Sequence, residues 1–432
     1  MWRRSRGRAR QRSSSTSTTR FLRACSSSAA RPLTTPPSPR PVLAGLRIVE
    51  LSAFVAAPIG GATLAALGAD VIRVDPPGGG IDIDRWPLHR GRSLYWAGLN
   101  QGKRSVTIDT RSEAGRRQVA RLIAAPGEGG GIVLTNLPVK GWNSYAELAK
   151  LRPDLIMVVI TGDRDGGTAV DYTVNAALGF PWLTGPEGHD GPVNHVLPAW
   201  DAMTGFLAAF AILAAERHRR LTGEGQLVEV SLSDVGLAVS GHLGLLGEAV
   251  LEPEPRGRYG NDVYGTFGRD FATRDQRRVM VLALTERQWS SLGQATALAA
   301  DFAAIESQFG ADLSKEADRW TYRSQIGALL ERWIAQRDLG EVNAAFESHG
   351  VLWGPYQTVK QLVAEDPRAS IANPLFAEVE YPGLGRFLTA ASPLRFGAAA
   401  PLPARAAPRL GQHTEEVLNE FGIGPATTKE GP

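Results

Sequence analysis

The sequence is short of cysteine, and this scarcity excludes several classes of protein. The chain of 432 residues holds one cysteine, Cys25, near its start. The rest of the chain therefore has no disulfide, no cysteine nucleophile and no cysteine metal ligand, which is typical of a reducing compartment. Seven scattered histidines show neither H-x-x-x-H nor H-E-x-x-H spacing, so we expect no metal site.

Long hydrophobic runs and nucleotide-binding motifs are also missing. No stretch approaches the roughly 18 apolar residues that a membrane span needs, so we expect no membrane partner. The longest apolar run, residues 206–215, predicts a buried helix. No G-x-G-x-x-G follows the first predicted strand, and no G-x-x-x-x-G-K-[ST] occurs. These absences disfavour a nicotinamide-dependent enzyme and exclude a P-loop nucleotide triphosphatase.

Acidic residues are absent from residues 1–40, which hold ten Arg. Because the whole chain carries +3, the remainder carries −7, and the basic pI comes from this segment. A mildly acidic remainder argues against a nucleic-acid surface. An Arg- and Ser-rich segment without acids is typical of an organellar transit peptide or a disordered extension. We therefore expect residues 1–41 to lie outside the fold, in a cytoplasmic protein or, if they are a transit peptide, a mitochondrial-matrix protein.

Apolar strands alternate with helices along the next part of the chain. The pattern predicts strands and helices in this order: strand Arg47–Leu51, helix Ile59–Leu67, strand Val71–Val74, strand Ser105–Ile108, helix Glu113–Ala124, strands Ile132–Thr135 and Leu155–Ile160, and the long helix Ala202–Arg219. This alternation indicates an α/β fold with a doubly wound, Rossmann-like parallel sheet. Composition becomes rich in Gly and Pro near residue 255. We expect a large domain over residues 42–255, a smaller α+β domain over 256–340, and a return to the large domain over 341–432.

Asp201 stands immediately before the predicted long helix. An Asp there accepts hydrogen bonds from the free amides of the first turn, which is a structural role. The same position suits a nucleophile, because a helix N-terminus favours the charged carboxylate and keeps its pKa at or below about 3.9. Position alone leaves both roles open.

Two polar loops are candidates for ligand contacts. Lys103 and Arg104 enter a predicted strand, and Arg111 follows it, so three cations could meet the phosphates of an anionic ligand or simply face solvent. The loop at residues 161–167 follows another strand, and the carboxyl ends of parallel strands are where open α/β sheets bind ligands.

Five stretches, in the right order, carry a family resemblance. They are Gly45–Leu51, Leu67–Val74, Asn100–Asp109, Arg219–Gln226 and Leu410–Thr414. On these stretches the chain resembles the class III coenzyme A transferases, the family of formyl-CoA transferase, carnitine CoA-transferase and α-methylacyl-CoA racemase. The resemblance runs from about residue 43 to about 422. It implies that the nucleophile is an Asp opening a helix near mid-chain, and Asp201 is the matching residue.

The resemblance also implies substrates, partners and contacts. Coenzyme A (CoA) thioesters and dicarboxylates are the expected partners, with no permanently bound cofactor, and the expected assembly is an interlocked homodimer. Catalysis would pass through an anhydride and a CoA thioester on Asp201, with amides at the helix start as candidate oxyanion donors. The expected CoA contacts are Val55, Ile108, Arg111, Asn136, Leu137 and Lys140, together with Lys103 and Arg104. Val55 and Leu137 replace a polar and an aromatic residue of the family pattern, and Lys140 is out of register.

Residues near Asp171 separate the branches of this family. Racemases place a His before this Asp, whereas Val170 has no proton to exchange, so Asp171 is expected to support Asp201 instead. Other stretches are most similar to a branch that moves CoA from one carboxyl of 2-methylfumarate to the other within a single bound molecule. Arg164 and His195 are candidates for binding a substrate carboxylate. Two alternatives stay open: an intermolecular transferase using a donor such as succinyl-CoA, and a non-catalytic CoA-binding protein.

Overall fold

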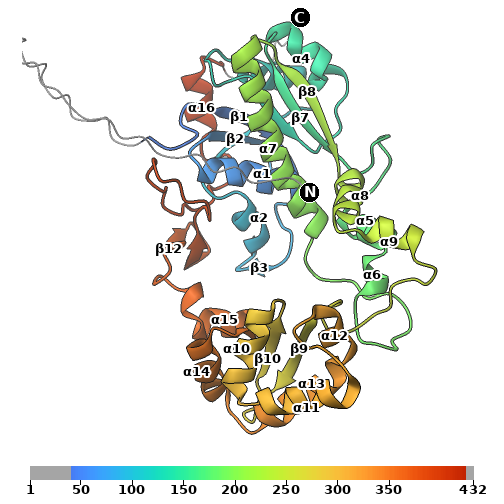
Figure 1. Ribbon diagram of the computed structural model, residues 1–432. Coiled ribbons are helices and arrows are strands. Elements are labelled where there is room, and N and C mark those ends of the chain that lie inside the picture. The colour runs from blue at the N-terminus through green and yellow to red at the C-terminus, as the bar shows by residue number, and fades with distance from the viewer. Residues whose placement is uncertain (1–39, 425–432) are drawn as a thin grey trace, which may run out of the picture. The chain divides into compact units, whose positions relative to one another are not determined.

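The computed structural model describes residues 40–424 and is built around a six-stranded parallel sheet (Figure 1). Residues 1–39 of the expected tail lie outside the described residues. The strand order is β5 (Arg104–Thr107), β2 (Asp70–Asp75), β1 (Arg47–Leu51), β6 (Ile132–Thr135), β7 (Ile156–Thr161), β8 (Gln226–Ser231). In chain order, β2 and β5 are added on one side of β1, and β6, β7 and β8 are then added on its other side. The predicted doubly wound sheet is confirmed, and its switch point lies between β1 and β6.

Helices cover both faces of this sheet. On one face, α1 (Ala56–Ala66) and α7 (Ala199–Thr222) pack on side chains such as Ile48 and Val158. On the other, α3 (Glu113–Ala124), α4 (Tyr145–Leu151) and α16 (Thr414–Glu420) pack on side chains such as Val49 and Met157. Because the central strands are buried on both sides, their sequences are continuous apolar runs rather than alternating patterns.

Two glycines set how closely α1 and α7 approach. A Cβ added to Gly205 would lie 2.1 Å from Cγ2 of Ile59 and 2.4 Å from the carbonyl oxygen of Ala56. A Cβ on Gly60 would lie 2.8 Å from the Gly205 carbonyl oxygen. The helix α7 is long and apolar enough to cross a membrane by length and composition, but Ala208 and Ile212 are buried in the core of the sheet domain. This packing fixes the start of α7 over the sheet.

A smaller antiparallel sheet has its own core. Its order is β11 (Leu352–Tyr356), β10 (Arg278–Ala283), β9 (Phe267–Ala272), and its helices are α10 (Glu286–Thr296), α11 (Ala299–Phe309), α12 (Glu316–Thr321), α13 (Arg323–Ala335) and α14 (Leu339–His349). The expected domain boundary at residue 340 needs correction, because it cuts α14. Since β11 pairs with β10 and Phe346 is buried in this core, the smaller unit continues past residue 350.

The remaining elements are short. They are β3 (Leu88–His89), β4 (Arg92–Ser93), α2 (Leu94–Leu99), a 3-10 turn at Gly141–Asn143, α5 (Asp171–Ala177), α6 (Phe180–Leu183), α8 (Leu232–His242), α9 (Leu245–Leu251), α15 (Val359–Glu365), a 3-10 turn at Pro367–Ala369, β12 (Phe376–Tyr381) and β13 (Gly385–Ala390). Near the C-terminus, the ring of His413 accepts a hydrogen bond from the Ser105 amide (3.1 Å), and the Thr414 hydroxyl accepts one from the Thr107 amide (3.0 Å). The family stretch Leu410–Thr414 therefore contacts the edge strand β5, and Thr414 is the first residue of α16.

Candidate active site

A cavity of about 640 Å³ opens at the carboxyl edge of the parallel sheet. Four of its lining residues follow or end four strands: Phe54 after β1, Asn136 after β6, Thr161 at the end of β7 and Leu232 after β8. The cavity therefore spans the switch point, where open α/β sheets bind ligands. Its charged lining residues are Arg85, Asp171 and Asp201.

Asp201 is the third residue of α7 and lines this cavity. Among residues 40–424 its carboxylate has no hydrogen-bond or ion-pair partner. The expectation that Asp201 caps the helix is wrong, because α7 begins two residues earlier. The expected low pKa is also wrong: burial, and then the negative charge of Asp171, raise the pKa of Asp201 to about 6. The charge of Arg85 acts in the opposite direction and lowers this pKa.

Asp171 performs the capping role instead. Its Oδ2 accepts hydrogen bonds from the amides of Trp200 (2.7 Å) and Asp201 (3.1 Å), and the side chain is 2% exposed. The first residue of α5 thus satisfies free donors at the start of α7. These two amides are consequently occupied, so the expectation that they serve an oxyanion needs correction.

A second side chain of α5, that of Asn175, also forms a hydrogen bond near the start of α7. The Oδ1 of Asn175 accepts a hydrogen bond from the indole Nε1 of Trp200 (3.2 Å) and lies 3.0 Å from Nε2 of His195. Asn175 and Trp200 are buried, at 1% and 2% exposed. Two side chains of α5 therefore hold the backbone and the neighbour of Asp201, which keeps that carboxylate in one place.

Asn136 bridges the switch point. Its Oδ1 accepts a hydrogen bond from the Ala53 amide (2.9 Å), and its Nδ2 donates one to the Ala53 carbonyl (2.7 Å). The loop after β6 is thereby fixed to the loop after β1, where Val55 precedes α1. These two hydrogen bonds fix the two loops to each other beside the Asp201 cavity, which Asn136 lines.

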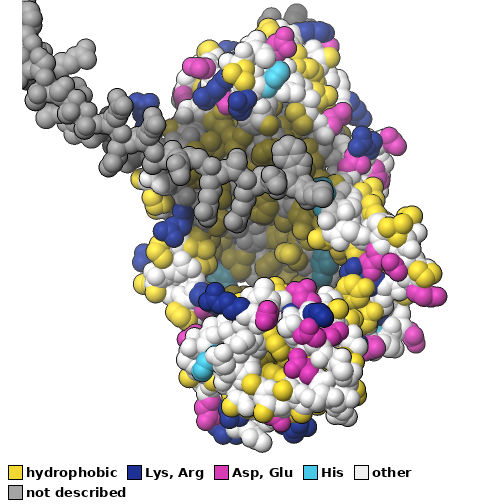
Figure 2. Space-filling view, in the orientation of Figure 1, with side chains coloured by type: hydrophobic (Ala, Val, Ile, Leu, Met, Phe, Trp, Pro, Cys, Tyr) yellow, Lys and Arg dark blue, Asp and Glu magenta, His cyan; other side chains and the backbone are white. Residues whose placement is uncertain are grey.

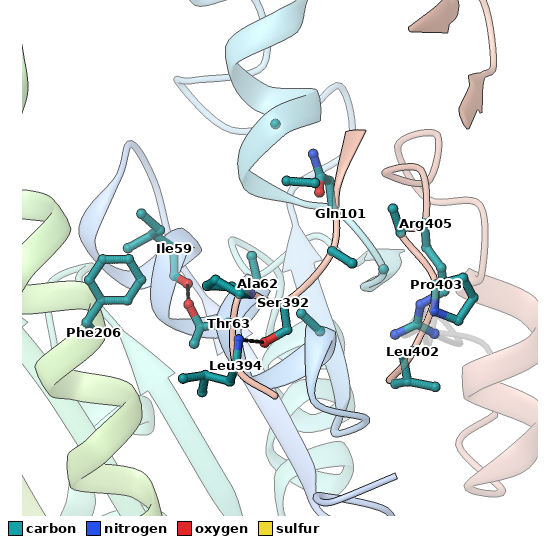
Figure 3. A pocket seen from close by; sticks show the side chains of 17 residues that line it. Ile59, Ala62, Thr63, Gln101, Phe206, Ser392, Leu394, Leu402, Pro403 and Arg405 are labelled. Carbon is teal, nitrogen blue, oxygen red and sulfur yellow. Dashed lines mark hydrogen bonds between the residues drawn. The ribbon is translucent and has the colours of Figure 1, made fainter. Parts of the chain in front are cut away.

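A separate hollow of about 490 Å³ lies over α1 (Figure 3). Its polar side chains bond within the fold: Thr63 donates to the Ile59 carbonyl (2.7 Å), and the Ser392 hydroxyl accepts from the Leu394 amide (3.2 Å). Arg405 donates to the Ala65 carbonyl (2.9 Å). No carboxylate lines this hollow. Among the described lining residues, the carboxylate that the expected acyl transfer needs is therefore found in the Asp201 cavity and not in this hollow.

Comparison with known proteins shows the family to which this chain belongs. The family model for CoA-transferase family III matches residues 43–414. The chain belongs to CoA-transferase family III. This transferase is 55% identical over 381 residues to the 2-methylfumaryl-CoA isomerase of Chloroflexus aurantiacus, covering 88% of this chain and 93% of that protein. It is 28% identical over 402 residues to the succinyl-CoA–D-citramalate CoA-transferase of the same organism, covering 89% and 94%. A solved CaiB/BaiF family protein from Brucella suis superposes with a TM-score of 0.72 at 26% identity, covering 88% and 99%.

Six of the predicted CoA contacts, all except Lys103 and Arg104, lie in loops at the carboxyl edge of the sheet. Val55, Asn136 and Leu137 follow β1 and β6 at the switch point, while Ile108 and Arg111 follow β5. Val55 and Ile108 are buried, whereas Arg111 is exposed and pairs with Asp109 at 2.8 Å. Lys140 is exposed and lies two residues after Pro138 in the loop that follows β6. Contact of these residues with CoA stays a prediction.

Lys103 lies in a different environment from the one expected. It is 3% exposed, and its Nζ donates to Glu50 (2.8 Å), to the Pro58 carbonyl (2.9 Å) and to Asn100 (2.9 Å). Burial lowers its pKa to about 8, against the attraction of Glu50. The expected phosphate contact therefore needs correction, because all three donors of this ammonium are already used inside the fold.

Three other predicted ligands are likewise engaged elsewhere. Arg104 pairs with Asp70 and Glu416 beside β5, and the exposed Arg164 pairs with Asp234 at 2.9 Å. His195 is held against Asn175. Neither Arg164 nor His195 lines the Asp201 cavity, so this geometry does not support the substrate-carboxylate role expected for them. Within residues 40–424, no three His, Cys, Asp or Glu side chains come together in a way that could hold a metal ion.

Arg85, whose cationic side chain lines the cavity, was not predicted from the sequence. It lies in the loop between β2 and β3, after three consecutive glycines, Gly78 to Gly80, where no motif marks it. Tyr95 in α2, another lining residue, was missed for the same reason. The one available signal was position: Arg85 follows β2 at the same carboxyl edge as the residues after β1 and β6.

Proposed function

We propose that this transferase converts 2-methylfumaryl-CoA into 3-methylfumaryl-CoA by moving CoA from one carboxyl group to the other within one bound molecule. The identity of 55% to a 2-methylfumaryl-CoA isomerase, over nearly the whole length of both chains, is the observation that carries this proposal. The intermolecular transferases among the relatives are more distant, at 28% identity or less.

Asp201 is the nucleophile of the proposed reaction. Its carboxylate attacks the thioester carbonyl, the C–S bond breaks, and the CoA thiolate leaves a mixed anhydride. The thiolate then attacks the Asp201 carbonyl of that anhydride, which frees the 2-methylfumarate dianion and leaves CoA on Asp201 as a thioester. Two easier exchanges replace one difficult step.

The second half repeats this chemistry with the other carboxylate. The freed diacid attacks the aspartyl-CoA thioester through its far carboxylate and expels the thiolate. The thiolate attacks the diacid carbonyl of the new anhydride, and Asp201 leaves as a carboxylate. All bonds and charges balance, and no further reactant enters.

The environment of Asp201 suits this role. With a pKa of about 6, the group is about nine-tenths ionised at pH 7 and more basic than an ordinary carboxylate, so it is a better nucleophile. No cation neutralises it by direct contact among the described residues. Asp171 and Asn175 hold the start of α7 and so fix the direction of attack.

One incubation tests the proposal. Purified protein given 2-methylfumaryl-CoA alone is expected to form 3-methylfumaryl-CoA, measured by liquid chromatography with mass detection. Addition of isotopically labelled 2-methylfumarate should leave the product unlabelled. Conversion that requires an added acid, or a product that carries the label, would favour the intermolecular transferase instead.

We also propose that the active assembly is a homodimer. The exposed side of α7 carries Phe206, Leu207 and Phe210, which are 53%, 42% and 65% exposed. Figure 2 shows hydrophobic side chains gathered on the face where α1 and α7 lie. A contiguous apolar surface of this kind favours a protein interface. Light scattering at micromolar concentration should give twice the chain mass, and a monomer mass would contradict the proposal.

A further inference from the structure

We propose that Arg85 binds the carboxylate of the substrate that is not joined to CoA, and thereby selects dicarboxylyl thioesters. This inference rests on the proposed function and adds a specificity determinant to it. Of the described residues that line the Asp201 cavity, Arg85 is the one with a cationic side chain. A diacid thioester has one free carboxylate beyond its reacting carbonyl, and that anion needs a cation in the same cavity.

Two aromatic rings hold the guanidinium of Arg85. Its Cζ lies 5.2 Å from the ring centroid of Phe54 and 5.2 Å from that of Tyr95. Such faces attract a guanidinium and leave its N–H donors at the rim available. Within residues 40–424, Arg85 has no acidic partner at ion-pair distance. Apart from its contact with the Tyr95 side chain, its donors remain available to bind a carboxylate in a two-pronged fashion.

The backbone of Arg85 is anchored on both sides. Its amide donates to the Asp82 carbonyl (3.2 Å), and its carbonyl accepts from the Ser93 hydroxyl (2.5 Å). Asp82 is itself buried, with its carboxylate 3.1 Å from the Arg73 guanidinium. The loop that carries Arg85 is thus tied to the core of the sheet domain, so the cation is in place before substrate binds.

The same anchor sets the ring of Phe54. The Phe54 amide donates to Oδ2 of Asp82 (3.1 Å), and Phe54 has a φ of 61°, a left-handed conformation that a bulky side chain rarely adopts. Strain of this kind persists where surrounding contacts enforce it, commonly at functional sites. Asp82 therefore positions both the cation and one of the rings beside it.

The two carboxylates of the cavity make the positive charge of Arg85 necessary for binding a diacid. Asp171 and Asp201 repel a second carboxylate, so a diacid enters only where a cation offsets them. The charge of Arg85 also opposes the rise in the pKa of Asp201 that burial and Asp171 cause. After CoA moves to Asp201, the freed diacid has two carboxylates. The diacid then turns: the far carboxylate leaves Arg85 for the aspartyl thioester, and Arg85 takes the newly freed carboxylate, which keeps the acid from leaving between the two halves of the reaction.

Binding measurements separate this role from contact with the phosphates of CoA. In an Asp201→Asn background, where no acyl transfer occurs, calorimetry would compare 2-methylfumaryl-CoA with 2-methylcrotonyl-CoA, in which a methyl group replaces the free carboxylate. Arg85→Met should weaken the diacid thioester roughly 10- to 100-fold and the monoacid thioester less than about 3-fold. Arg85→Lys should fall between, because it keeps the charge but not the planar fork.

Arg90→Met is the matched control. Arg90 is exposed in the turn between β3 and β4, five residues from Arg85, and does not line the cavity, so both affinities should stay unchanged. Equal weakening of both thioesters by Arg85→Met would assign Arg85 to the CoA moiety and overturn the inference. An unchanged diacid affinity would also overturn it.

A second measurement uses the active enzyme. With Asp201 intact, Arg85→Met should allow labelled 2-methylfumarate from solution to enter the product, which the wild type excludes. Product that stays unlabelled at a measurable turnover would contradict retention by Arg85. Failure of the wild type to isomerise 2-methylfumaryl-CoA would overturn the proposed function, while the calorimetry would still decide whether Arg85 recognises a free carboxylate.

Discussion

Two groups of carboxylates lie near the same edge of the sheet and have opposite surroundings. Glu50, Asp75 and Asp82 are fully buried with Arg73 and Lys103, and we call these five residues the β1–β2 ion cluster. Every carboxylate in the cluster has a cation within 4 Å. Asp201 and Asp171, by contrast, line an open cavity, and neither is ion-paired among the described residues.

The difference separates a structural use of charge from a chemical one. In the cluster, the carboxylates bond to Arg73 and Lys103 inside the fold, and none of them lines the Asp201 cavity. At the start of α7, burial and then the negative charge of Asp171 raise the pKa of Asp201, and its oxygens have no partner among residues 40–424. Burial alone therefore does not mark a candidate nucleophile: Asp171 is buried but caps α7, whereas Asp201 faces the cavity with an unpartnered carboxylate among the described residues.

Replacement of the nucleophile should have the largest effect. Asp201→Asn removes the attacking carboxylate at nearly constant size, so we expect the rate of 2-methylfumaryl-CoA isomerisation to fall by roughly 10³-fold or more, with thioester binding retained. Steady-state kinetics and calorimetry measure the two quantities. Asp165→Asn, in an exposed loop after β7, is the control and should keep full activity. Residual activity within tenfold of wild type would remove Asp201 from the mechanism.

Disruption of the β1–β2 ion cluster should instead appear in stability. Arg73→Met leaves Asp75 and Asp82 without their buried cation, which costs on the order of 3–5 kcal/mol in the free energy of unfolding. Arg274→Met is the matched control, because that arginine pairs with Asp338 and Glu341 at the surface, where the loss is within about 1 kcal/mol. Urea unfolding followed by tryptophan fluorescence measures both. Equal losses would mean that the cluster contributes no more than a surface pair.

Sequence predicted the sheet domain better than the site. The strands Arg47–Leu51 and Ile132–Thr135 and the helix Glu113–Ala124 were predicted at their observed bounds, because apolar runs between turn residues determine them locally. The segment that holds β11 was assigned to the large domain because its partner β10 lies about 70 residues earlier, and local patterns contain no information on such pairing.

The site depended on contacts that the sequence does not display. Asp171 and Asp201 are thirty residues apart, and only the folded chain shows that one accepts the amide of the other. The expected pKa of Asp201 was in the wrong direction because the helix N-terminus was considered without burial and without Asp171. Lys103 was assigned to a ligand because an exposed and a buried lysine look alike in sequence.

The raised pKa of Asp201 implies a cost in stability that an uncharged residue would remove. Its pKa is about 6 in the folded chain and near 3.8 when unperturbed, so ionisation disfavours folding above about pH 6 and has no effect below about pH 4. Asp201→Asn should therefore stabilise the protein by on the order of 1–3 kcal/mol at pH 8 and by nothing at pH 4. Denaturant unfolding at the two pH values tests this. A gain that is the same at both would trace to packing rather than to charge.

Asp171→Asn should give the smallest change, a shift in pH dependence. Protonation of Asp201 should make wild-type kcat/KM decline as pH falls through about 6. The substitution removes the negative charge beside Asp201 but keeps an oxygen that can cap α7, so the pKa of Asp201 and the acid limb should move down by roughly half a unit to one unit.

Other ionisable groups around this cavity should leave the direction of that shift unchanged. Arg85 already lowers the pKa of Asp201, and burial raises the pKa of the neighbouring Tyr95, which is therefore neutral in this pH range. Asp165→Asn, on its exposed loop, should leave the limb in place and so control for a general change of charge. A limb that stays fixed or moves up in Asp171→Asn would mean that burial alone sets the pKa of Asp201. The difference between Asp201 and the carboxylates of the β1–β2 ion cluster would then come from the missing cation and not from Asp171.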